Sequence, residues 1–148
     1  MSLKEKLAED LKSAMKDKDI IRKNVVQLVR AGVLQIEKDN KVTLDDEGVL
    51  DVIAKQLKQR RDSLPDYEKS GREDLIAELK AEMDVLMGYL PEQLTKEELE
   101  VIVNDAVIKT GASSMKDMGK IMAEVMPKTK GRADGKVINE IAKAILSK

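Results

Sequence analysis

Residues 75–99 read LIAELKAEMDVLMGYLPEQLTKEEL, and this stretch decides both the fold class and the division of the chain. Its apolar residues recur every three or four positions up to Leu90, which is the spacing of one face of an α-helix. Pro91 interrupts the pattern, and Thr95 with Glu98 then forms a capping box, the signature of a new helix start. The stretch therefore predicts one amphipathic helix, a short linker and a second helix.

Four helices are expected before this linker, because the same spacing extends back to the N-terminus. The residues that mark their starts are Ser2 with Glu5, Ile20, Thr43 with Asp46, and Leu75. Gly32 lies inside the second helix and weakens it by roughly 1 kcal/mol relative to alanine unless close packing compensates. Pro65 lies in the third helix and is expected to end or kink it, since proline disfavours helical geometry in the preceding residue.

Three shorter helices are expected after the linker. Their starts are marked by Thr95, by Ser113 or Ser114, and by Asp134, while Gly111 and Pro127 mark the ends of the first two. The chain is therefore predicted to be all-α, with an N-terminal antiparallel four-helix unit over residues 1–90 and a C-terminal three-helix tail domain over residues 91–148.

The composition excludes several classes of chemistry. The 148 residues include no cysteine and no histidine, which removes disulfides, thiolate or imidazole metal ligands and a Ser-His-Asp triad. Asp45, Asp46 and Glu47 are three carboxylates in one helical turn, an ordinary arrangement beside the positive end of a helix dipole. There is no GxxxxGK[ST] nucleotide loop. We predict no metal, no cofactor and no catalytic residue.

The N-terminal sequence MSLKEKLAEDLK is charged throughout and contains no apolar segment of the signal-peptide kind. No run of the chain approaches the roughly 18 apolar residues of a membrane span. The expectation is a soluble cytoplasmic protein without membrane association. The sequence does not indicate an oligomeric state.

Basic residues concentrate towards the C-terminus. Lys and Arg number 27 and Asp and Glu 28 in the whole chain, whereas residues 113–148 carry eight basic and four acidic side chains. The sequence MPKTKGRADGK, residues 126–136, places two glycines and four basic residues directly before a helix start. Backbone N–H groups at such a start can bind a phosphate. The alternative is an ordinary loop with left-handed glycine and Asp134 as the N-cap.

The only two aromatic residues are expected to serve packing. Tyr67 is expected to be semi-buried with its hydroxyl beside a charge, and Tyr89 to anchor the junction with the linker. No role is predicted for the basic residues near Tyr67, which are Arg60, Arg61 and Arg72.

Three stretches of the chain resemble the GatB/YqeY family. They are KQLKQRRDSLPDYEKSGREDL (55–75), LMGYLPEQLTKEEL (86–99) and GASSMKDMGKIMAEVMPKTKGRADGKVINEIAKAIL (111–146). Their order and spacing are similar to those of a stand-alone YqeY-like protein over essentially the whole chain. The segment after Leu90 is also similar to the tail domain of the B subunit of the bacterial tRNA-dependent amidotransferase.

The resemblance implies contact with RNA rather than catalysis. The tail engages tRNA in the amidotransferase, whose catalytic domain and glutamine-hydrolysing subunit have no counterpart in this chain. The RNA- or phosphate-binding positions that the resemblance suggests are Lys116, Lys120, Lys128, Lys130, Gly131, Arg132, Gly135 and Lys136. Because no aromatic residue accompanies them, contact is expected with backbone phosphates rather than stacked bases.

The resulting hypothesis is a non-catalytic protein that binds tRNA or another structured RNA, or assists an aminoacyl-tRNA or amidotransferase assembly. One alternative is a carbon–nitrogen ligase with glutamine as amido donor, acting within such an assembly. A second is a protein-interaction module, in which methionine-rich helix faces dock a partner helix. The methionines concerned, which also suit the core of a small domain, are Met115, Met118, Met122 and Met126.

Overall fold

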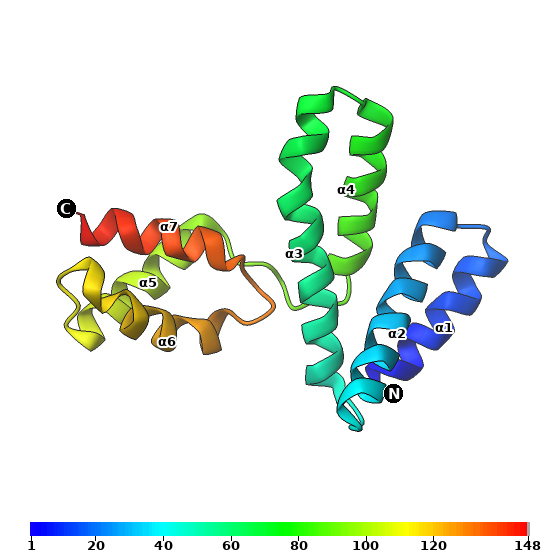
Figure 1. Cartoon of the computed structure of the whole chain (residues 1–148), viewed down its shortest axis with the longest axis horizontal. Coiled ribbons are helices and arrows are strands. Elements are labelled where there is room, and N and C mark those ends of the chain that lie inside the picture. Colours follow the sequence, from blue (N-terminus) through cyan, green and yellow to red (C-terminus); the bar gives the residue numbers. More distant parts are fainter. Residues whose placement is uncertain (148) are drawn as a thin grey trace. The chain divides into compact units, whose positions relative to one another are not determined.

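The computed structural model describes residues 1–147, which divide into two compact units, Met1–Leu90 and a second unit beginning at Pro91. Every regular element within residues 1–147 is a helix (Figure 1), which confirms the all-α prediction. Each unit has a buried aliphatic core of its own.

The N-terminal unit consists of two helical hairpins (Figure 1). In the first, α1 (Leu3–Lys16) packs against α2 (Ile20–Asn40). In the second, α3 (Asp46–Ser70) packs against α4 (Glu73–Met87). Contacts of α2 with α3 and α4 join the two hairpins into one unit.

Side-chain caps fix where these helices begin. Ser2 and Glu5 form the predicted capping box at α1, with a bond of 3.1 Å from the Glu5 backbone N–H to the Ser2 hydroxyl. At α3 the cap is Asp45 rather than the predicted Thr43, and its carboxylate accepts the Gly48 N–H at 2.9 Å. A carboxylate at this position also faces the positive end of the helix dipole, which makes it a stronger cap than a hydroxyl.

The sequence predicted that Pro65 would either end or kink its helix. The first of these outcomes is wrong, because α3 continues past Pro65. The helix continues to Ser70, and Gly71 follows in left-handed geometry with a φ of 69°. Proline removes one backbone hydrogen bond from a helix interior. Packing of α3 against α4 offsets that loss, because tertiary contacts supply most of a helix's stability.

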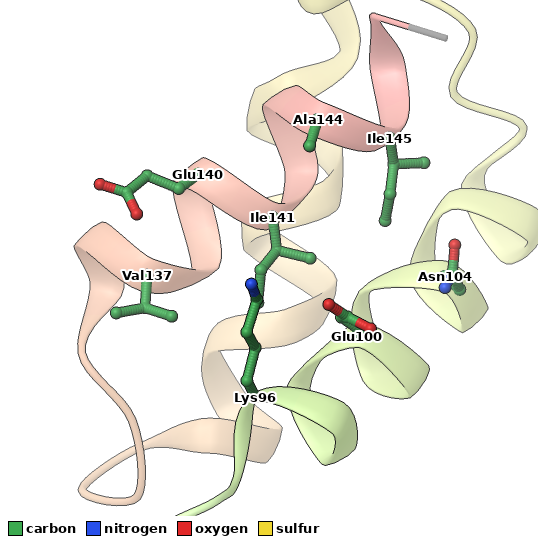
Figure 2. A pocket seen from close by; sticks show the side chains of 8 residues that line it. All are labelled: Lys96, Glu100, Asn104, Val137, Glu140, Ile141, Ala144 and Ile145. Carbon is green, nitrogen blue, oxygen red and sulfur yellow. The ribbon is translucent and has the colours of Figure 1, made fainter.

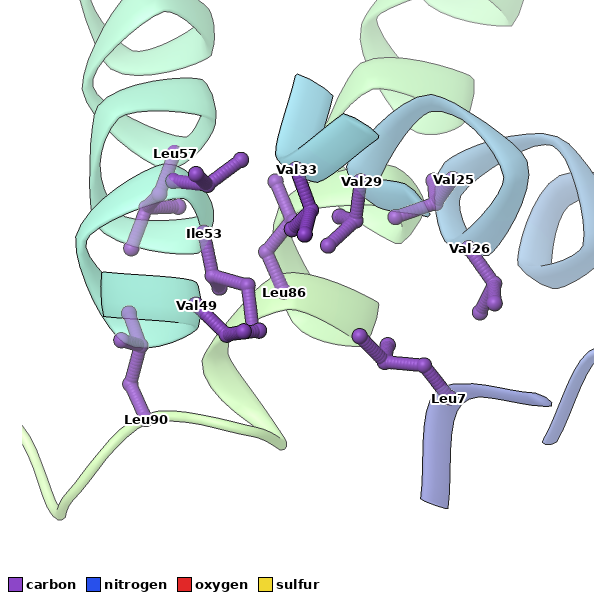
Figure 3. Packing of buried hydrophobic residues seen from close by; sticks show 11 residues of the cluster. Leu7, Val25, Val26, Val29, Val33, Val49, Ile53, Leu57, Leu86 and Leu90 are labelled. Carbon is purple, nitrogen blue, oxygen red and sulfur yellow. The ribbon is translucent and has the colours of Figure 1, made fainter. Parts of the chain in front are cut away.

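The core of the N-terminal unit is entirely aliphatic (Figure 3). Valines of α2 face side chains from each of the other three helices. Removal of any one helix would therefore expose core side chains of the remaining helices to solvent. The most buried members of this core are Leu7, Val25, Val26, Val29, Val49, Ile53, Leu57 and Leu86.

Gly32 allows α2 to approach α3 closely. A Cβ atom at this position would lie 3.0 Å from Val52 Cγ1 and 3.1 Å from Gln56 Nε2. The Gln56 amide donates to the Leu28 carbonyl at 3.0 Å. The close packing that could compensate for the low helix propensity of Gly32 is therefore present.

The C-terminal unit contains α5 (Lys96–Thr110), the short 3₁₀ helix η1 (Met115–Asp117), α6 (Met118–Thr129) and α7 (Gly135–Leu146). The predicted Thr95 and Glu98 capping box starts α5, and Gly111 ends it with a φ of 67°. Pro127 lies in the last turn of α6. The buried residues of this core are Leu99, Val103, Ala106, Ile121, Val125, Ile138, Ile141 and Ala142.

Candidate nucleic-acid interface

The loop between α6 and α7 turns at Gly131. The φ of Gly131 is 74°, a left-handed value that glycine adopts without steric cost. The next residue, Arg132, donates its backbone N–H to the Thr129 carbonyl at 2.8 Å. Thr129 is 1% exposed, and its hydroxyl donates to the Val125 carbonyl at 3.1 Å. The loop is thus a defined turn tied to the end of α6.

The same loop is held by the segment that leads into α5. The Leu94 N–H donates to the Arg132 carbonyl at 2.8 Å, and the Gln93 amide donates to the Gly131 carbonyl at 2.8 Å. The Arg132 Nε donates to the Glu92 carbonyl at 3.1 Å. Gly131 and Arg132 therefore have a structural role in addition to the predicted phosphate contact. Nothing in the sequence signalled these bonds, because they join residues about 40 positions apart.

The start of α7 has a cap of its own. The Asp134 carboxylate accepts the Lys136 N–H at 3.0 Å, as the ordinary-loop alternative predicted. Gly135 is the first residue of the helix, and the Lys136 side chain is exposed. An intrinsic carboxylate thus occupies the position where the helix dipole would favour a bound anion. Any phosphate contact at this end must come from the basic side chains.

Asp117 organises the start of η1 and α6. Its carboxylate accepts the backbone N–H groups of Ser113 at 3.0 Å and Ser114 at 3.4 Å, and Lys120 lies 3.9 Å away. The bond from Ser113, reinforced by Ser114 and the Lys120 charge, holds the pKa of Asp117 below its ordinary value. The Asp117 carboxylate therefore stabilises the turn before α6, while Lys116 and Lys120 are exposed.

Glu124 lies between two lysines on the surface of α6. Its carboxylate is 2.7 Å from Lys109 Nζ of α5 and 3.7 Å from Lys128 Nζ. The hydrogen bond from Lys109 is the main cause that lowers the pKa of Glu124, and the same bond raises the pKa of Lys109. Sequence reasoning missed Lys109, since nothing in the chain order places it beside α6.

The predicted site residues form two groups at the two ends of α6 and not one pocket. Lys116 lies in η1 and Lys120 in the first turn of α6. Lys128 lies in the last turn of α6, separated from Lys120 by about 12 Å at 1.5 Å per residue. We call residues 116–136 the basic segment. Its exposed cationic side chains are Lys116, Lys120, Lys128, Lys130 and Lys136.

The methionines of η1 and α6 divide between core and surface. Met118 and Met122 pack against the core of the C-terminal unit. Met115 is 48% exposed and Met126 45% exposed. Two of the four residues of the proposed methionine docking face therefore stabilise the domain interior instead.

The arginines near Tyr67 contact groups within the N-terminal unit. Arg60 donates to the Gln56 carbonyl at 3.1 Å, and its Nε lies 3.7 Å from Glu82. Arg72 lies 3.5 Å from Asp74. These contacts are structural, and they assign no binding role to this surface.

The two tyrosines differ. Tyr67 is 37% exposed, more open than the predicted semi-buried ring. Tyr89 packs against the core of the N-terminal unit, and its hydroxyl donates to Asp10, which also lies 3.2 Å from Arg22. Burial, followed by the Asp10 contact, raises the pKa of Tyr89 far above its ordinary value.

The part of the chain that the structure describes contains neither a metal-binding group of side chains nor a membrane-spanning helix. Within residues 1–147, no three acidic side chains are grouped so that they could hold a metal ion. In the same residues, no helix combines the length and the apolar character needed to cross a membrane.

Comparison with known proteins identifies the family. The family described as "Yqey-like protein" matches residues 4–146. "Altered inheritance of mitochondria protein 41, mitochondrial" of Pyrenophora tritici-repentis is 31% identical over 132 residues, which cover 86% of this chain and 71% of the relative. The proteins of the same name from Vanderwaltozyma polyspora and Kluyveromyces lactis are 33% identical over 120 residues and 40% identical over 84 residues.

The last two alignments cover 76% and 56% of this chain but only 64% and 45% of the relatives. All three relatives are named as mitochondrial proteins. This finding contradicts the prediction of a cytoplasmic protein, which rested on the absence of an apolar leader. A hydropathy argument detects only apolar leaders, and mitochondrial targeting sequences are amphipathic.

Proposed function

Because the chain belongs to the Yqey-like protein family, we propose that its C-terminal unit binds structured RNA, with tRNA as the first candidate, through backbone phosphates. The observation that carries the proposal is the separation of charge within this unit. Residues 92–105 contain five acidic side chains and one basic one, whereas the basic segment contains six basic and three acidic ones. The similarity of the segment after Leu90 to the tRNA-engaging amidotransferase tail supports the same assignment.

The three acidic residues of the basic segment reduce its positive charge only slightly, because each already has partners within the unit. Asp117 accepts two backbone N–H groups and Asp134 a third, so both carboxylates serve the local turns. Glu124 is the only other acidic residue in the segment, and lysines contact it from two helices. The side chains left facing solvent are mainly lysines.

Lysines suit contacts to phosphates and RNA shape. A lysine ammonium is a point charge on a flexible stem that can follow a phosphate backbone. Such contacts position a protein on a helix without reading bases. The proposal is therefore binding without sequence specificity, in which RNA shape selects the partner.

Charge reversal tests the proposal directly. The variant Lys116→Glu, Lys120→Glu, Lys128→Glu changes the basic segment but leaves Arg132, which holds the loop to Glu92. The control Lys12→Glu, Lys55→Glu, Lys80→Glu makes the same change of net charge at exposed positions of the N-terminal unit. We expect tRNA binding at low salt to fall at least about ten-fold in the first variant and to change little in the control. Two results would refute the placement of the RNA-binding surface on the basic segment. One is an equal loss of tRNA affinity in both variants, and the other is unchanged tRNA affinity in the variant of the basic segment.

A further inference from the structure

A second candidate surface lies between α5 and α7, and it uses none of the basic segment's exposed lysines (Figure 2). It is a groove of about 350 Å³. On the α7 side an apolar stripe with helical spacing lines it, formed by Val137, Ile141, Ala144 and Ile145. On the α5 side the lining is polar, formed by Lys96, Glu100 and Asn104.

Exposed apolar side chains extend the groove along α5. Lys96, Glu100 and Asn104 recur every four residues, and Ile108 continues that row by one further step. Ile108 is 79% exposed, and Val101, which neighbours Asn104 and Ile108 on the helix surface, is 60% exposed. Single exposed aliphatic residues need no explanation, but two of them beside an apolar groove indicate a contact surface.

The rim of this groove is acidic. Glu100 and Glu140 line it, and Glu97 and Asp105 are exposed on the same outer side of α5. Lys96 is the only basic residue in the lining. Lys109 contributes its charge elsewhere, because it contacts Glu124 on α6. The surface therefore offers an apolar floor with negative edges.

We propose that this groove docks an amphipathic helix of a protein partner. The aliphatic side chains of that helix enter the groove beside Ile141 and Ala144, and its Lys and Arg side chains pair with Glu100 and Glu140. A helix is the occupant of choice because the row from Lys96 to Ile108 on α5 is about 18 Å long at 1.5 Å per residue, a length that three helical turns match. The proposal is independent of RNA binding, since the two surfaces share no lining residue.

A designed peptide on the full chain tests the proposal. The probe is a synthetic helix of about 18 residues, with leucines at positions i, i+3, i+4 and i+7 and lysines elsewhere. One control peptide has the same composition in an order without the leucine stripe, and another has glutamate in place of lysine. We expect the probe to bind at least about ten-fold more tightly than either control by fluorescence anisotropy. In NMR spectra its largest amide shifts should fall at Asn104, Ile141 and Ala144.

Two variants identify the groove itself. Ala144→Glu puts a charge on the exposed apolar edge, and the pair Glu100→Lys, Glu140→Lys reverses the rim. Both are expected to weaken the probe at least about ten-fold while helical circular dichroism stays as in the parent. Ala144→Glu lies outside the basic segment and should leave tRNA binding within about two-fold. The matched control is Lys116→Glu, Lys120→Glu, Lys128→Glu, which should leave peptide affinity within about two-fold while it weakens tRNA binding.

Three outcomes would overturn the proposal. The first is equal binding of the three peptides, and the second is amide shifts centred outside the groove. The third is a dimer in sedimentation that Ala144→Glu converts to a monomer, because a second copy of this chain would then be the occupant. If the parent protein does not bind tRNA, the proposed function is refuted, but the proposal for the groove is unaffected.

Discussion

Gly32→Ala is expected to destabilise the N-terminal unit by about 1–3 kcal/mol. The added methyl group would lie 3.0 Å from Val52 Cγ1, and Val52 is 5% exposed and cannot move away freely. It would also lie 3.1 Å from Gln56 Nε2, whose bond to the Leu28 carbonyl would be strained. Overpacking costs about 1–3 kcal/mol and the hydrogen bond about 1 kcal/mol, against a helix-propensity gain of about 1 kcal/mol.

Urea denaturation followed by circular dichroism measures this change, and Gly119→Ala provides the control. Gly119 lies in α6, and a Cβ atom there would meet nothing within 4 Å. That variant should be neutral or stabilising by at most about 1 kcal/mol, since only helix propensity changes. If Gly32→Ala stabilised the protein as much as Gly119→Ala does, the close approach of α2 and α3 would be refuted.

Three other predictions concern stability. Tyr89→Phe removes the hydroxyl group that donates a hydrogen bond to Asp10, and it should lower the free energy of unfolding by about 1–2 kcal/mol in urea denaturation. Tyr67→Phe should change the free energy of unfolding by less than about 0.5 kcal/mol. Equal effects of the two substitutions would contradict the Asp10 contact. Bonds from the Lys4 side chain and the Leu44 N–H lower the pKa of Glu37 from 4.5, so its contribution to folding is present above pH 4.5 and is lost as the pH falls through the folded value. Melting temperatures between pH 6 and pH 3 should therefore fall less steeply in Glu37→Gln than in the parent, and parallel curves would contradict this account. Residues 1–90 and 91–148, expressed separately, should each remain helical and melt cooperatively; a fragment without a cooperative transition would show that the two units depend on each other.

Much of the fold was predictable because it follows from local patterns. The capping boxes at Ser2 and Thr95 and the left-handed glycine at Gly111 depend on residues within a few positions, and the structure has all three. The effect of Pro65 was harder to predict, because the continuation of α3 depends on its packing against another helix. Local rules therefore marked capped helix termini better than the effect of a proline inside a helix.

The candidate site was less predictable for the same reason. The sequence identified the exposed lysines of the basic segment, since charge is a property of composition. It gave no sign that Arg132 bonds to Glu92, nor that Lys109 of α5 contacts Glu124 of α6. The groove between α5 and α7 was missed too, because it exists only once the two helices lie side by side.

Salt dependence tests the central claim, phosphate binding by the basic segment, most directly. The measurement is the slope of log K against log salt for tRNA binding, in the parent and in Lys116→Gln, Lys120→Gln, Lys128→Gln. Each lysine that neutralises a phosphate contributes roughly 0.7–0.9 to the slope through counterion release. The account predicts a steep slope for the parent and one shallower by about 2–3 for the variant. A slope that the three substitutions leave unchanged would contradict it.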